Sequence, residues 1–73
     1  MSYYEDLNDD TRNNIWACLW EKVKLSKEHK KTAKLSNMKF EDYIEEVVSD
    51  WINTHNWDLS DADWEEQAEA ADI

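Results

Sequence analysis

Residues 40–52 have the sequence FEDYIEEVVSDWI, the most regular helical pattern in the chain. The apolar side chains in this stretch recur every three or four positions: Phe40, Tyr43, Ile44, Val47, Val48, Trp51 and Ile52. That spacing places them on one face of an α-helix. Ser36 or Asn37 is suited to cap the start, and the polar residues 53–56 break the pattern, so we predict a helix over roughly residues 37–54.

The same period recurs in the first third of the chain. Its apolar positions are Ile15, Trp16, Leu19, Trp20 and Val23. Asn8, Asp9 and Asp10 precede them and are good N-cap residues, which predicts a helix over roughly residues 9–26.

Capping signals mark two further segments. Ser60, with Asp63 three residues on and a Leu59 to Trp64 staple, predicts a helix over roughly residues 61–71. Ser2 and Glu5 have the spacing of a capping box, which predicts a short helical turn near the N-terminus.

The chain has 73 residues and contains no glycine and no proline, the two residues that tight β-turns use most. We therefore predict an all-α fold, a small bundle of about three helices in a single domain over residues 1–73. Residues 27–35 are either helix or linker, and the C-terminal helix is either docked or mobile. Trp16, Leu19, Ile44, Val48 and Trp51 are predicted to be among the most buried side chains.

Composition argues against catalysis and metal binding. Cys18 is the only cysteine and lies on or beside the apolar stripe of its helix, where a thiol packs as a small hydrophobe. His29 and His55 stand in polar surroundings without a zinc-ligand pattern, which is typical of surface histidines. A calcium loop would need a different spacing of acids. We predict no enzyme activity, no cofactor and no metal.

The first residues are acidic where a secretory signal is basic, and the longest apolar run, residues 15–20, is too short to span a bilayer. These features predict a cytoplasmic protein, or one of the host cytoplasm if the chain is viral, with no membrane contact.

Charge is separated along the chain, whose formal net charge is −10. Residues 1–10 carry four acids and no base, residues 11–35 seven bases and two acids, residues 36–55 five acids and one base, and residues 56–73 seven acids and no base. Solubility needs less charge than this, with the signs mixed.

Within the acidic blocks, carboxylates recur every four residues and form rows along the predicted helices. Each step advances about 6 Å, similar to the spacing of phosphates along a nucleic acid. Aromatic residues in weakly apolar segments are common anchors of protein interfaces. The predicted partner-binding residues are Glu41, Asp42, Glu45, Glu46, Asp50, Asp58, Asp61, Asp63, Glu65, Glu66, Glu69, Trp57 and Trp64.

These rows favour an inhibitor or regulator that occupies the basic, nucleic-acid-binding surface of another protein, in the manner of the small DNA mimics of phages and mobile elements. One alternative is a helical adaptor or antitoxin-like partner that binds through an apolar or aromatic patch. Another is direct nucleic-acid binding by the basic stretch, which the net charge disfavours. Its lysines are Lys22, Lys24, Lys27, Lys30, Lys31, Lys34 and Lys39. A homodimer that completes a small core is a further alternative.

Overall fold

The computed structural model describes residues 2–55 and 57–73, in which the chain forms four α-helices and one short 3-10 helix. The elements are η1 (Tyr4–Asp6), α1 (Asp9–Leu25), α2 (Lys27–Leu35), α3 (Phe40–Thr54) and α4 (Asp61–Ala70). The predicted all-α class is confirmed. The predicted number of about three helices is wrong by one, because residues 27–35 form a separate helix.

Ser26 separates α1 from α2. Its backbone is extended, with φ −79° and ψ 121°, and its N–H donates to the carbonyl of Val23 at the end of α1. Its hydroxyl then accepts from the N–H of His29, at 3.3 Å, and so caps the start of α2. One serine therefore ends the first helix and begins the second.

Asn37 ends α2 in the left-handed conformation, with φ 55°. Its N–H donates to the carbonyl of Lys34 at 3.2 Å, and the N–H of Met38 donates to the carbonyl of Ala33 at 3.3 Å. This pair of bonds is the Schellman motif, in which asparagine is the usual substitute for glycine. The prediction that Ser36 or Asn37 caps the next helix is wrong, since α3 begins after Lys39, which makes no side-chain capping bond.

Two other predicted caps are confirmed. The side chain of Asn8 accepts from the N–H of Thr11 at 2.8 Å, and that of Ser60 accepts from the N–H of Asp63 at 3.3 Å. The capping box at Ser2 is not formed. The short helical turn that it predicted is present as η1, but its N-cap is Tyr3, with no side-chain bond. Ser2 instead forms an isolated antiparallel bridge with Leu59.

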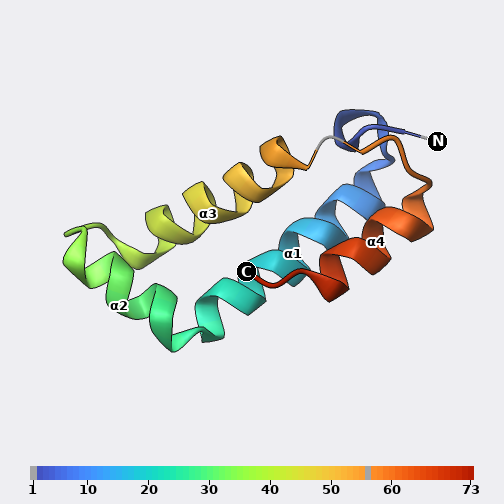
Figure 1. The fold of residues 1–73 in the computed structure, drawn as a ribbon. Helices are drawn as coiled ribbons and strands as arrows, with labels where there is room; N and C mark the ends of the chain where they lie inside the picture. Colours follow the sequence, from blue (N-terminus) through green and yellow to red (C-terminus); the bar gives the residue numbers. More distant parts are fainter. Residues whose placement is uncertain (1, 56) are drawn as a thin grey trace.

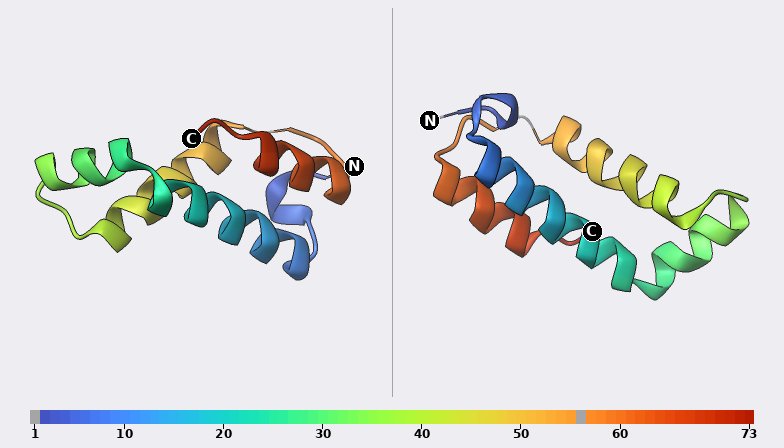
Figure 2. Two further views of the ribbon diagram at one scale, coloured as in Figure 1. Left: turned by 90° about the horizontal axis from the view of Figure 1, so that it is seen from below. Right: turned by 180° about the vertical axis from the view of Figure 1, so that it is seen from behind.

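The molecule is elongated, with extents of 39 × 19 × 18 Å. Helix α1 lies between α3 and α4, and α2 continues beyond α1 to the end of the molecule farthest from η1 (Figure 1). The view from behind shows the same arrangement, and α1 contacts both α3 and α4 (Figure 2, right). Among the helices of residues 2–55 and 57–73, none combines the length and apolar composition needed to cross a bilayer.

The core lies where α1, α3 and α4 meet. Its buried members are Leu7, Ile15, Leu19, Val23, Ile44, Val48, Ile52, Trp64 and Ala68. Leu19, Ile44 and Val48 are buried as predicted, whereas Trp16 and Trp51 are only half-buried at its edge. Trp64 has no exposed surface, so the C-terminal helix is docked by its tryptophan.

Candidate protein-binding surface

Helix α3 carries five exposed carboxylates, here called the α3 acidic surface: Glu41, Asp42, Glu45, Glu46 and Asp50. Three of them, Asp42, Glu46 and Asp50, lie on its outer side. The opposite side of the helix buries Ile44, Val48 and Ile52. Because the apolar side faces the core, Asp42, Glu46 and Asp50 face away from the rest of the bundle, whereas Glu41 and Glu45 are exposed on the flank of the buried side.

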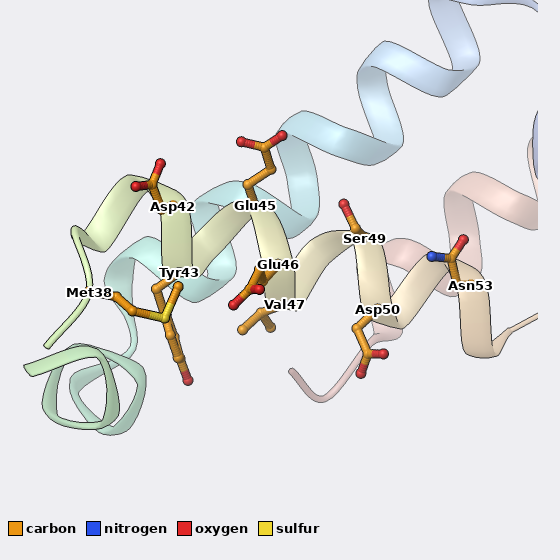
Figure 3. Close-up of a pocket in the computed structure, with 9 residues that line it drawn as sticks. All are labelled: Met38, Asp42, Tyr43, Glu45, Glu46, Val47, Ser49, Asp50 and Asn53. Carbon is orange, nitrogen blue, oxygen red and sulfur yellow. The ribbon is translucent and has the colours of Figure 1, made fainter. Parts of the chain in front are cut away.

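Asp42, Glu46 and Asp50 form the predicted row of one carboxylate per four residues. In Figure 3, Asp42 points to one edge of α3, whereas Glu46 and Asp50 point to the other. The row therefore crosses the outer face obliquely, because four residues slightly exceed one helical turn.

An open depression of about 710 Å³ lies along the same face of α3. Met38, Tyr43 and Val47 supply apolar surface to it, beside the carboxylates of the row (Figure 3). The α3 acidic surface thus combines negative charge with apolar contact area.

No basic side chain neutralises these carboxylates within residues 2–55 and 57–73. The single ion pair recorded there joins Arg12 to Asp9, on α1. None of the five side chains of the α3 acidic surface accepts a hydrogen bond from another described side chain. Their negative charge is therefore available to a partner.

The carboxylate row of α4 lies in a different setting. Asp61 accepts hydrogen bonds from Asn8 Nδ2 at 2.9 Å and from Thr11 Oγ1 at 2.8 Å. Glu65 accepts from Asn14 Nδ2 at 3.2 Å. Both predicted binding residues are half-buried against α1, where they hold α4 in place.

The backbone at the end of α4 is also bound to α1. Lys22 Nζ donates to the carbonyl of Glu69 and, at 2.9 Å, to that of Ala71. A lysine at a helix C-terminus is favourable because the last carbonyls lack intrahelical partners. The other acidic residues predicted in this region, Asp58, Asp63, Glu66 and Glu69, have exposed side chains.

Trp64 is not available to a partner, which corrects its predicted role as a binding residue. Its Nε1 donates to the carbonyl of Ser2 at 2.7 Å, and Tyr4 contacts its ring edge-on at a centroid distance of 6.0 Å. Trp57 is half-buried, with its ring centroid 5.6 Å from that of Trp64.

Trp57 continues an aromatic cluster to the end of α3. Its ring lies 5.8 Å from Trp51 and 4.8 Å from His55, and His55 stacks on Trp51 at 4.4 Å. The cluster joins the C-terminus of α3 to α4. Periodicity could not indicate it, because Trp57 lies in the segment between these helices.

The phenol of Tyr4 is half-buried beside α1. Burial raises the pKa of its phenol above the usual 10.0, and the positive charge of Arg12 lowers it by a smaller amount. The phenol oxygen is 3.4 Å from the carbonyl of Arg12, to which it donates.

Both histidines, predicted to lie at the surface, are half-buried, and both have partners. His29 Nδ1 is 2.8 Å from the hydroxyl of Tyr43, and His55 Nδ1 is 2.6 Å from the carbonyl of Trp51. Cys18 is half-buried beside the groove between α1 and α4. In the described part of the chain, no group of three His, Cys, Asp or Glu residues is placed to hold a metal ion.

Comparison with known proteins gives no match: no protein family, no curated protein and no solved structure is similar to the chain.

Proposed function

We propose that the chain is a non-enzymatic regulator whose α3 acidic surface occupies the basic, nucleic-acid-binding surface of another protein. The observation that carries the proposal is the row Asp42, Glu46 and Asp50, which is exposed and has no basic partner in the described structure. Its members repeat about every 6 Å along α3. A protein surface that binds successive phosphates offers basic groups at a comparable repeat.

The row has a structural cost that supports a functional role. Like charges at i and i+4 destabilise a helix by a few tenths of a kcal/mol for each pair. In the α4 row, by comparison, the repulsion between Asp61 and Glu65 is offset by their hydrogen bonds to α1. The α3 row makes no such bond, so its benefit is expected to come from binding.

The charge and the apolar surface would contribute differently. The net charge of −10 steers the chain toward a basic partner and raises the association rate. Met38, Tyr43 and Val47, which line the depression, would add affinity once the surfaces meet. Such a regulator would act in the cytoplasm, or in the host cytoplasm if the chain is viral.

The apolar wall of this depression also favours a second candidate, a helical adaptor or antitoxin-like partner. The dependence of affinity on salt concentration distinguishes the two candidate functions. A charge-driven complex loses affinity steeply as ionic strength rises, whereas an apolar one does not.

The test is affinity capture from the source organism on the immobilised chain, followed by elution with duplex DNA or RNA. Wild-type chain is expected to retain a basic protein that the nucleic acid displaces. D42N/E46Q/D50N should lose most of that protein. The matched control, E5Q/D6N/D10N, removes three exposed carboxylates outside the α3 acidic surface and should retain it.

Two results would overturn the proposal. One is equal capture by wild type and by D42N/E46Q/D50N. The other is loss of capture by K30A/K31A with normal capture by the acidic variant, which would assign binding to the basic stretch.

A further inference from the structure

Helix α2 has a basic outer side, here called the α2 basic surface: Lys27, Lys30, Lys31 and Lys34, all exposed. Its inner side faces α3, since Ala33 is buried and His29 bonds to Tyr43. None of the four lysines is in an ion pair in the described structure. The lysines therefore form a second charged surface, of opposite sign to that on α3.

The two charged surfaces have the same repeat. Lys27 and Lys31 are four residues apart, as are Lys30 and Lys34, so each pair spans about 6 Å along its helix. Asp42, Glu46 and Asp50 repeat at that interval on α3. Two helices with equal repeats and opposite charges can pair along their length.

An exposed leucine lies at the end of α2. Leu35 follows Lys34 directly and exposes 80% of its surface, the largest value among the large apolar residues of the described chain. The depression on α3 offers Met38, Tyr43 and Val47 as apolar neighbours, with room for a leucine side chain. The apolar parts of the two surfaces therefore match as their charges do.

We infer that the chain associates with a second copy of itself, with the α2 basic surface of each copy packed on the α3 acidic surface of the other. We place the two contacts about a two-fold axis, so that both form at once and the assembly closes at a dimer; the same contacts arranged head to tail would extend into a chain. The inference rests on the proposed function only in treating the α3 acidic surface as a binding surface. Because the dimer covers that surface, self-association and capture of a basic partner exclude each other.

The net charge does not prevent this contact. At physiological ionic strength the Debye length is about 8 Å. The molecule is 39 Å long and α2 forms one end of it (Figure 2). The electrostatic energy of contacts at that end therefore depends more on nearby charges than on the net charge of the whole chain.

Sedimentation of the full-length chain over a range of concentrations tests the inference. Wild type should form a reversible dimer. D42K/E46K/D50K and K27E/K31E/K34E should each stay monomeric, with the dimer dissociation constant raised at least about tenfold. Mixed together, the two variants should form a one-to-one dimer, because their reversed surfaces are again complementary.

A smaller change checks the apolar part of the contact. L35S should weaken the dimer without changing the far-ultraviolet circular dichroism, because Leu35 is exposed in the monomer. Circular dichroism also controls the fold of both triple variants. If K27E/K31E/K34E is not folded, K27Q/K31Q/K34Q replaces it and should still be monomeric.

A wild-type chain that is monomeric at every concentration would overturn the inference, as would a mixture of the charge-reversed variants that fails to pair. The proposed function is tested separately, because K27E/K31E/K34E keeps the α3 acidic surface and should capture the basic protein even when it cannot dimerise. Binding of labelled duplex DNA by a monomeric wild type, lost in K27E/K31E/K34E, would assign α2 to nucleic acid instead.

Discussion

Trp64 Nε1 donates a hydrogen bond to the backbone carbonyl of Ser2, 2.7 Å away, and so ties α4 to the start of the chain. The same carbonyl accepts the N–H of Leu59 at 3.0 Å. Trp64 is fully buried, so its indole N–H would be left without a partner if this bond were lost while the ring stayed buried. This one side chain therefore joins residues 62 positions apart in sequence.

Trp64→Ala is expected to lower the free energy of unfolding by about 3–5 kcal/mol, because it removes a large buried ring and leaves a cavity. Trp57→Ala is the matched control and should cost clearly less, since Trp57 is half-buried. Urea denaturation followed by circular dichroism measures both. Equal losses for the two variants would contradict the conclusion that the buried ring of Trp64 docks α4 on the core.

Asn37→Ala is expected to destabilise the chain by about 1–2 kcal/mol, because alanine is disfavoured at the positive φ of this position. Asn37→Gly should cost nothing, since glycine adopts this conformation freely. Thermal unfolding would show the alanine variant melting several degrees lower, by about 4–8 °C per kcal/mol for a domain of this size. Asn53→Ala, exposed on α3, controls for the loss of an asparagine and should not lower the melting temperature.

The predicted helices agree with the structure where a local pattern specifies them. The stripe of α3 and the caps at Asn8 and Ser60 depend on neighbours within a few residues, and all three are confirmed. The prediction that the first helix ends near residue 26 agrees with α1, which ends at Leu25. The sequence leaves open whether residues 27–35 continue as helix, because their polar composition is compatible with a helix and with a linker. The extended backbone of Ser26 is visible only in three dimensions.

The candidate surface was predictable only in part, for a similar reason. The rows beginning at Asp42 and at Asp61 have the same spacing in sequence, but only the second faces another helix. The residues that bond to Asp61 are Asn8 and Thr11, about fifty positions away. No local pattern indicates which side of α4 such distant residues will contact.

Stability is expected to fall at alkaline pH through Tyr4. Its phenol has a raised pKa in the folded chain, so between the ordinary value of 10.0 and the folded value the unfolded chain has lost the proton that the folded chain keeps. Stability is therefore fully present below about pH 10 and decreases as the pH rises above it. Tyr4→Phe should lessen this decrease, whereas Tyr3→Phe, at an exposed position, should not. Urea titrations at several alkaline pH values compare the variants, and equal slopes for Tyr4→Phe and wild type would contradict the role of Tyr4.

Substitution in the two carboxylate rows should affect stability to different extents. Asp61→Ala removes the acceptor of the Thr11 hydroxyl, and Thr11 is buried, so we expect a loss of about 1–3 kcal/mol in the free energy of unfolding. D42N/E46Q/D50N removes exposed charges that repel one another and should change that free energy by less than about 0.5 kcal/mol.

Urea is the appropriate denaturant for this comparison, because it is uncharged and leaves the electrostatic interactions unscreened, unlike guanidinium chloride. A large loss in the α3 variant would mean that its carboxylates stabilise the fold and would remove the main support for a binding role. If D42N/E46Q/D50N is as stable as wild type but no longer captures the basic protein, the two rows have different roles. The α4 carboxylates then hold the bundle together, and the α3 carboxylates contact the partner.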